Sequence, residues 1–354
     1  MPFARKSKIS GLHSIPANTT SVFLEKCLNG IFPLIRCFSA APVSGKTNNA
    51  AFRRKNRFFS LLLTACLKCF GGIMDIIKSI ILGIIEGITE WLPISSTGHL
   101  IIADEFIKLG MTDEFMEMFN VVIQLGAILA VVVIFWNKMW PFTADKTKGY
   151  NYITKGNGLI KKDVMDMWFK VIAAMLPAAI VGIPFDNYFE KHFHNWQVVS
   201  AALIVYGVLF IVIEKMNKNR KPKVNSIPEL SYKTALLIGC FQALSLIPGT
   251  SRSGSTILGA MILGVSRVAG AEFSFFLAVP VMFGASLIKL LKFGFTFTGM
   301  ELAVLAVGTL TSFIVSVIAI KFLISYVRRH DFSLFGYYRI ALGVIVIAYF
   351  LIAG

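Results

Sequence analysis

Eight long runs without Asp, Glu, Lys or Arg dominate the 354-residue chain and restrict what it can fold into. About 20 apolar residues cross a membrane as a helix, and flanking residues whose charges can snorkel extend the shorter runs to that length. With 56% hydrophobic and only 15% charged residues, a soluble fold would expose too much apolar surface. We therefore predict an all-α polytopic membrane protein. The runs are 118–137, 171–185, 195–213, 234–251, 253–266, 273–288, 302–320 and 340–354.

The net charge of +16 is distributed unevenly along the chain. Residues 1–73 hold eleven Lys or Arg residues and a single acid, Glu25, so they supply most of it. The other basic residues cluster in short loops between apolar runs, which is the positive-inside pattern of membrane proteins. A nucleic-acid-binding surface would need a continuous basic face instead. The expected partners are membrane lipids and no nucleic acid.

Residues 1–73 form a basic N-terminal extension that differs from the rest of the sequence. The charged stretch and short apolar run at 53–66 are typical of a targeting segment. The alternative is that translation starts at Met74 and the extension is a mis-assigned start. Cys66 and Cys69 have CxxC spacing but no second ligand pair, which favours incidental apolar cysteines over a metal site. The integral membrane domain is expected over 74–354.

Two repeats are predicted within this domain, at 74–214 and 232–354. The pattern Gly83-x-x-Glu86 followed by a Pro-x-x-Ser break recurs as Gly239-x-x-Gln242 followed by a similar break. Each repeat is expected to contain a broken, re-entrant helical hairpin and three transmembrane helices. The expected helices are 75–92, 97–109, 116–137, 166–185 and 196–214, then 233–246, 253–264, 271–292, 300–324 and 335–353.

An odd number of spans per repeat predicts that the two repeats have opposite orientations in the membrane. The basic loops 138–162, 215–231 and 325–334 are expected on the cytoplasmic side, which leaves loops 186–195 and 293–299 outside. Broken helices in corresponding positions of inverted halves are the best sequence pointer to a site near the middle of the membrane.

The first break contains EGITEWLPISSTGH, residues 86–99. Glu86 and Glu90 are four residues apart and share a helix face, so in a membrane they need a cation, an Arg, a shared proton or water. We favour a divalent-cation site (Mg²⁺ or Ca²⁺) or an acid–base pair over a structural ion pair. Ser96 and His99 suggest a nucleophile and a base, although His99 could also be a buried structural imidazole. The neighbouring hydroxyls, expected to bind substrate, are Ser95 and Thr97.

The second break contains PGTSRSGST, residues 248–256. Arg252 is the only charged residue between Lys233 and Arg267. Free helix-start amides, hydroxyls and an Arg make an anion pocket that is best matched to phosphate. The alternative is that Arg252 only neutralises Glu86 or Glu90. The residues expected to bind substrate are Gly249, Ser251, Ser253 and Thr256.

Three other charged residues near the apolar runs carry weaker signals. Arg267 and Glu272 flank a short turn and are expected to pair with each other or to snorkel. Arg339, in the last span, is expected to reach a membrane interface.

Both motifs, together with EFSFFLAVPVMFGA at 272–285, resemble the undecaprenyl-diphosphate phosphatase family of bacteria, the bacitracin-resistance type. The resemblance covers Met74 to the C-terminus. It implies a bacterial inner-membrane enzyme that removes one phosphate from the polyprenyl diphosphate lipid undecaprenyl diphosphate, with a divalent cation. By this resemblance Glu86 and Glu90 handle the metal or a proton, and Arg252 holds the diphosphate.

Our hypothesis from the sequence is phosphoanhydride hydrolysis at a site that faces the outer side of the membrane. Ser96 is the first choice of nucleophile, activated by His99, and a water directed by the same His is the second. The rival hypothesis is a secondary transporter or a lipid flippase, because inverted repeats with broken helices are equally typical of those proteins. The sequence leaves a homodimer open.

Overall fold

The chain divides into two units, Met1–Ile73 and Met74–Gly354. The computed structural model describes residues 71–145, 149–151, 156–193 and 195–353. The predicted extension 1–73, with Cys66 and Cys69, therefore lies outside the described residues apart from its last three. The description below concerns the second unit.

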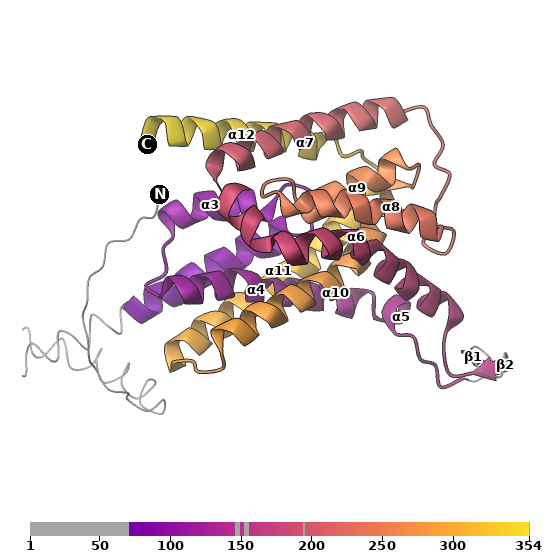
Figure 1. Cartoon of the computed structure of the whole chain (residues 1–354), viewed down its shortest axis with the longest axis horizontal. Coiled ribbons are helices and arrows are strands. Elements are labelled where there is room, and N and C mark those ends of the chain that lie inside the picture. The colour runs from indigo at the N-terminus through magenta and orange to yellow at the C-terminus, as the bar shows by residue number, and fades with distance from the viewer. Residues whose placement is uncertain (1–70, 146–148, 152–155, 194, 354) are drawn as a thin grey trace, which may run out of the picture. The chain divides into compact units, whose positions relative to one another are not determined.

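Helices dominate the described residues, and the predicted helices are confirmed to within a few residues at each end, except at the C-terminal end of the helix predicted over 166–185 (Figure 1). Most of them begin at a side chain that accepts a hydrogen bond from the amide three residues later, as Thr112, Ser231 and Thr298 do. The first described helix covers 71–89; then follow α3 (Ser96–Phe106), α4 (Asp113–Ile134), α6 (Lys162–Phe193), α7 (Trp196–Asn217), α8 (Tyr232–Ala243), α9 (Arg252–Ile262), α10 (Arg267–Phe293), α11 (Gly299–Val327) and α12 (Ser333–Ala353).

Six of the described helices are long and apolar enough to cross a membrane, namely α4, α6, α7, α10, α11 and α12. They leave large apolar side chains exposed, including Ile180 at 70% and Ile318 at 64%. Such a surface fits contact with lipid rather than with water. The protein is therefore a multi-pass α-helical membrane protein. Helices α3, α8 and α9 have 11, 12 and 11 residues, about half the length that a membrane requires.

The packing of the helices places the two broken regions next to each other. Helix α7 lies along α12, α4 packs against α10 and α11, and α6 packs against α8 (Figure 1). Helix α9 contacts α7, α8 and α10. The fully buried ring of Trp91, just after the first helix, meets Phe275 of α10 edge-to-face at 5.1 Å. This aromatic contact joins the first break to the helix that follows the second.

Two of the predicted loops contain structure that the sequence did not indicate. Helix α6 continues to Phe193, where a loop was expected at 186–195, because aromatic rings four residues apart support further turns. The Tyr188 and His192 rings stack with centroids 4.3 Å apart. Within loop 138–162, helix α5 (Trp136–Met139) precedes an antiparallel pair of strands, β1 (Gly149–Asn151) and β2 (Gly156–Gly158). Strands this short show too little alternation to be predicted.

Candidate functional site

Helices α3 and α9 begin at residues with the same unusual backbone conformation. Ser95 and Ser251 have φ angles of 73° and 69°, and they are the only non-glycine residues with positive φ in the described part of the chain. Each hydroxyl accepts a hydrogen bond from the amide three residues later, of Gly98 at 3.3 Å and of Gly254 at 3.2 Å. Left-handed serines cost free energy and tend to occur at functional sites. The Ser95 and Ser251 hydroxyls, predicted to bind substrate, thus serve here as helix caps.

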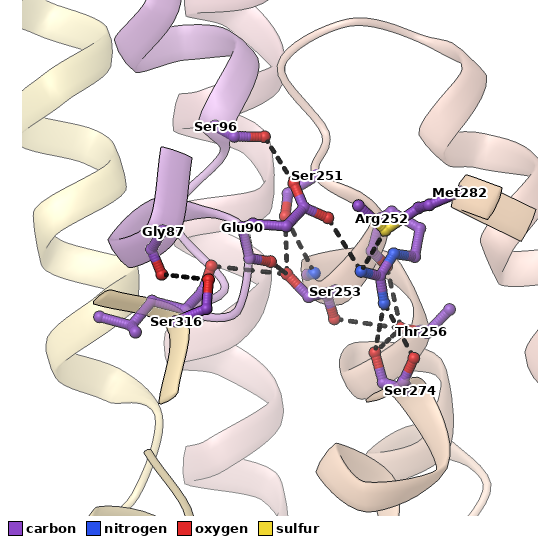
Figure 2. A network of polar contacts seen from close by, with 12 residues as sticks. Gly87, Glu90, Ser96, Ser251, Arg252, Ser253, Thr256, Ser274, Met282 and Ser316 are labelled. Carbon is purple, nitrogen blue, oxygen red and sulfur yellow. Dashed lines mark hydrogen bonds and ion pairs between the residues drawn. The ribbon is translucent and has the colours of Figure 1, made fainter. Parts of the chain in front are cut away.

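The Glu90 carboxylate connects the two breaks, as Figure 2 shows. Arg252 donates from Nη2 to Glu90 Oε1 at 2.9 Å, so the ion pair that the sequence allowed is present. Ser96 donates from Oγ to Glu90 Oε2 at 3.0 Å, and Ser253 donates to the Glu90 carbonyl at 3.1 Å. Predicted residues of both motifs therefore meet in one cluster, called below the Ser96–Glu90–Arg252 cluster.

The guanidinium of Arg252 is held by groups from the first break and from α10. Besides Glu90, it donates from Nη1 to the carbonyl of Ser274 in α10 at 2.8 Å and lies 5.5 Å from the centre of the Trp91 ring. Thr256, one turn along α9, exchanges a hydrogen bond with the Ser274 hydroxyl at 2.7 Å. The predicted Thr256 thus acts through Ser274, which the sequence did not single out. The plane of the guanidinium is fixed before any ligand arrives.

Glu86 is fully buried, and both of its carboxylate oxygens lack a hydrogen-bond partner among the described residues. The carboxyl interacts electrostatically with Glu90 and Arg252. A buried carboxylate without a donor, beside a second carboxylate, fits a cation or a shared proton. No group of three His, Cys, Asp or Glu side chains with metal-binding geometry occurs in the described ranges. A cation here would therefore need further oxygen ligands of another kind, such as hydroxyls, carbonyls, water or phosphate.

His99 does not form the predicted pair with Ser96. Its Nδ1 lies 2.7 Å from the Ser95 carbonyl, and its Nε2 lies 2.7 Å from the Tyr338 hydroxyl of α12. The His99 and Tyr338 rings are stacked, with an interplanar angle of 7°. Both nitrogens are thus engaged, and the hydrogen-bond partner of Ser96 is Glu90 instead. Thr97 is half-buried, and no side-chain hydrogen bond of Thr97 is found among the described residues.

Arg339 is the main site residue that the sequence analysis misplaced. Its side chain is fully buried rather than at a membrane interface. It donates to the carbonyl of Pro93 at 3.1 Å, of Gly249 at 2.8 Å and of Thr250 at 2.9 Å, and its guanidinium lies 5.4 Å from the centre of the Tyr206 ring. An isolated charge within a span was the available signal. Arg339 therefore fastens the two breaks together.

Arg267 and Glu272 do not pair with each other. Arg267 pairs with Glu214 of α7, and Glu272 pairs with Lys138 at 2.9 Å. Each joins α10 to a different helix, so the local ion pair, one of the two alternatives that the sequence left open, does not form.

Comparison with known proteins gives consistent results. The family model for the bacitracin resistance protein BacA matches residues 79–345. The undecaprenyl-diphosphatase of Enterococcus faecalis is 60% identical over 274 residues, 77% of this chain and 96% of that protein. The undecaprenyl-diphosphatase of Acetivibrio thermocellus is 58% identical over 279 residues, 78% of this chain and 98% of that protein. The resemblance seen in the two motifs is thereby confirmed, and the chain belongs to the bacitracin resistance protein BacA family.

Proposed function

We propose that this chain hydrolyses undecaprenyl diphosphate to undecaprenyl phosphate and inorganic phosphate, and so recycles the lipid carrier for cell-wall synthesis. The Ser96–Glu90–Arg252 cluster carries the proposal. A guanidinium beside helix-start amides can hold a diphosphate, and a hydroxyl bonded to a carboxylate is an activated nucleophile. The activity named for the relatives supports the same reaction, and the family links it to bacitracin resistance.

In this proposal Ser96 is the nucleophile and Glu90 is its base. The hydroxyl proton of Ser96 passes to Glu90 as the Ser96 Oγ–phosphorus bond forms and the bond to the bridging oxygen breaks. Undecaprenyl phosphate leaves, and water then hydrolyses the phosphoserine. Arg252 stabilises the negative charge that develops on the phosphate oxygens. The alternative nucleophile is a water held by Glu90 or His99.

A divalent cation, Mg²⁺ or Ca²⁺, is proposed at Glu86 and Glu90. The absence of donors around Glu86 among the described residues supports this assignment. Mg²⁺ in particular binds through one or two carboxylates together with substrate phosphates and water. When bound, the cation would neutralise phosphate charge. Chelation followed by re-addition of each metal, with phosphate release as the readout, tests the assignment, because a shared proton between the carboxyl groups would leave activity independent of the metal.

We also propose that 74–214 and 232–354 are inverted-topology repeats, each with a re-entrant hairpin. Equivalent contacts support this arrangement. A Cβ at Gly83 of the first helix would lie 2.6 Å from the Gly308 carbonyl of α11, the third helix after the second break. A Cβ at Gly239 of α8 would lie 2.2 Å from the Ala174 carbonyl of α6, which is the third helix after the first break when the four-residue α5 is left out. Corresponding glycines thus allow close packing of corresponding helices.

The proposed location is the bacterial inner membrane, with the site facing the outer side. The basic loops 138–162 and 215–231 support a cytoplasmic position for those segments. Labelling of single cysteines at Lys161 and at Lys191 with a membrane-impermeant reagent in intact cells tests the orientation. We expect reaction at position 191 and protection at position 161, and the reverse pattern would place the site on the cytoplasmic side.

Phosphate release by the purified protein in detergent, where no gradient exists, tests the function. Wild-type protein is expected to release phosphate from undecaprenyl diphosphate, and Ser96→Ala to lose this activity. Ser226→Ala, in the loop before α8, is the control and should keep it. Release that requires sealed vesicles would favour a secondary transporter or lipid flippase instead. Trapping of labelled phosphate on Ser96 distinguishes serine from water as the nucleophile.

A further inference from the structure

A cavity of about 450 Å³ lies apart from the Ser96–Glu90–Arg252 cluster and shares no lining residue with it. It lies where α7 and α11 end and where α10 begins, at Asn217, Val327 and Arg267. Ends of membrane-spanning helices lie near the boundary between lipid and water. The cavity is therefore at the level of the lipid headgroups.

The lining of this cavity is strongly basic. It contains a single carboxylate, Glu214, which pairs with Arg267 (2.8 Å from Nε) and also accepts the Phe332 amide at 2.9 Å. The remaining cationic side chains are exposed and form no ion pair within the described residues, so their charge is not neutralised by the protein. They are Lys218, Arg220, Lys221, Lys223 and Arg328.

The walls of the cavity are held in place by specific hydrogen bonds. The segment before α8 is tied to the turn after α9, because the amide of Lys223 donates to Gly264 at 2.8 Å and that of Ser266 donates to Val224 at 2.8 Å. Asn217 adds a side-chain bond to the Met261 carbonyl at 3.2 Å. The cations thus stand on a backbone that is already ordered without a ligand.

Apolar side chains complete the lining. Met261, Ile262, Leu263, Val265 and Val268 contribute to it, and Ile262 is 46% exposed. A cavity with unpaired cations, an apolar wall and a place at the membrane boundary matches a ligand that is anionic at one end and apolar at the other. Free inorganic phosphate would leave the apolar wall without a partner.

We propose that this cavity binds the headgroup phosphate of an anionic phospholipid, with an acyl chain against Ile262. Helix α9 begins at Arg252 and ends at this wall. Helix α10 begins at Arg267, which lines the cavity, and two turns later carries Ser274, whose carbonyl accepts from Arg252. A bound lipid therefore stabilises the two helices that position the catalytic guanidinium. The lipid-binding proposal itself does not depend on the proposed hydrolysis, because its readout is lipid retention.

The experiment uses the full chain, delipidated in a neutral detergent. Phosphatidylglycerol and phosphatidylcholine with the same acyl chains are added separately, and bound lipid is counted by native mass spectrometry while Tm is followed. The cavity variant is Lys218→Gln/Lys223→Gln/Arg328→Gln. The control is Lys215→Gln/Lys233→Gln/Arg329→Gln, which removes the same charge from exposed residues that do not line the cavity.

We expect wild type and the control to retain phosphatidylglycerol in preference to phosphatidylcholine and to gain Tm with it. The cavity variant should lose on the order of tenfold in phosphatidylglycerol affinity, since each basic residue near a membrane surface contributes attraction. A charge-preserving variant, Lys218→Arg/Lys223→Arg/Arg328→Lys, should retain the lipid and shows that the cavity tolerates substitution.

Three results would overturn the proposal. Equal losses in the cavity variant and the control would mean diffuse attraction to a basic surface. Equal retention of phosphatidylcholine by wild type would show that the negative charge is not recognised. Displacement of phosphatidylglycerol by potassium phosphate, but not by potassium chloride at the same ionic strength, would assign the cavity to free phosphate.

Discussion

The two helix breaks share a backbone design but differ in charge. In both, a left-handed serine caps a short helix, and the cap bonds the amide of a glycine three residues later. The first break carries Glu86 and Glu90, and the second carries Arg252. The position that corresponds to Glu86 is Gln242 in the second, and both side chains are buried without hydrogen-bond partners among the described residues.

This difference shows that the two breaks repeat one backbone conformation but carry different functional groups. The carboxylates come from one break and the guanidinium from the other, so neither break alone can neutralise its own charge. A buried ion whose partner is missing is strongly destabilising, which couples the packing of the two breaks to the assembly of the site. Arg339 reinforces this coupling through backbone carbonyls on both sides.

The largest expected effect is that of Arg252→Ala, which removes the charge contributed by the second break. Phosphate release should fall about 10³-fold, because a preorganised donor to the developing phosphate charge is lost. Arg329→Gln, at an exposed arginine just after α11, is the control, and this variant should keep wild-type activity. Full activity in a folded Arg252→Ala protein would refute the phosphate pocket.

The second expected effect tests the division of chemistry directly. Glu86→Gln places a glutamine where the second break has Gln242, and phosphate release should fall about 10²-fold because the carboxylate no longer handles a proton or cation. Stability should stay unchanged or rise, since a buried carboxylate without a donor is replaced by a neutral amide. Thermal unfolding in detergent measures this change in stability. Gln242→Met is the matched change in the second break; if it lost as much activity as Glu86→Gln, the two positions would share one role.

The sequence predicted the elements well but the partners only in part. Uncharged runs and Pro breaks are local signals, so the spans and the short helices α3, α8 and α9 were predictable. The ion pair of Glu90 with Arg252 could be anticipated because opposite charges in apolar runs require each other. The carbonyl partners of Arg339 could not, because every residue has a carbonyl and only the folded chain selects Pro93 and Gly249.

The position of His99 shows the same limit on prediction from sequence. Its spacing from Ser96 suggested a direct contact, yet the ring bonds Tyr338, which lies 239 residues away along the chain. Both nitrogens of His99 bond other groups, and Ser96 donates to Glu90 instead. Such choices depend on how α12 packs against α3, and no local pattern encodes that packing.

Arg339→Met should lower the free energy of unfolding by about 2–4 kcal/mol, since three buried carbonyls lose their donor while packing volume is kept. Thermal unfolding in detergent measures the loss. Arg339→Lys restores a charge but not the planar guanidinium that reaches several carbonyls, so it should recover only part of the stability. A folded Arg339→Met protein with wild-type stability and activity would show that the two breaks are held together without this residue.

The smallest expected effect concerns the shared backbone conformation. Ser95→Ala keeps the unfavourable positive φ and loses the cap, which should cost about 1 kcal/mol or more. Ser95→Gly also loses the cap but relieves the strain, so its stability should lie within about 0.5 kcal/mol of wild type. The same order should hold for Ser251→Ala and Ser251→Gly, because both serines have the same geometry. A reversed order at one serine alone would mean that the two breaks share a shape but not its energetic cause, and that the hydroxyl at that position has a further partner in the working protein.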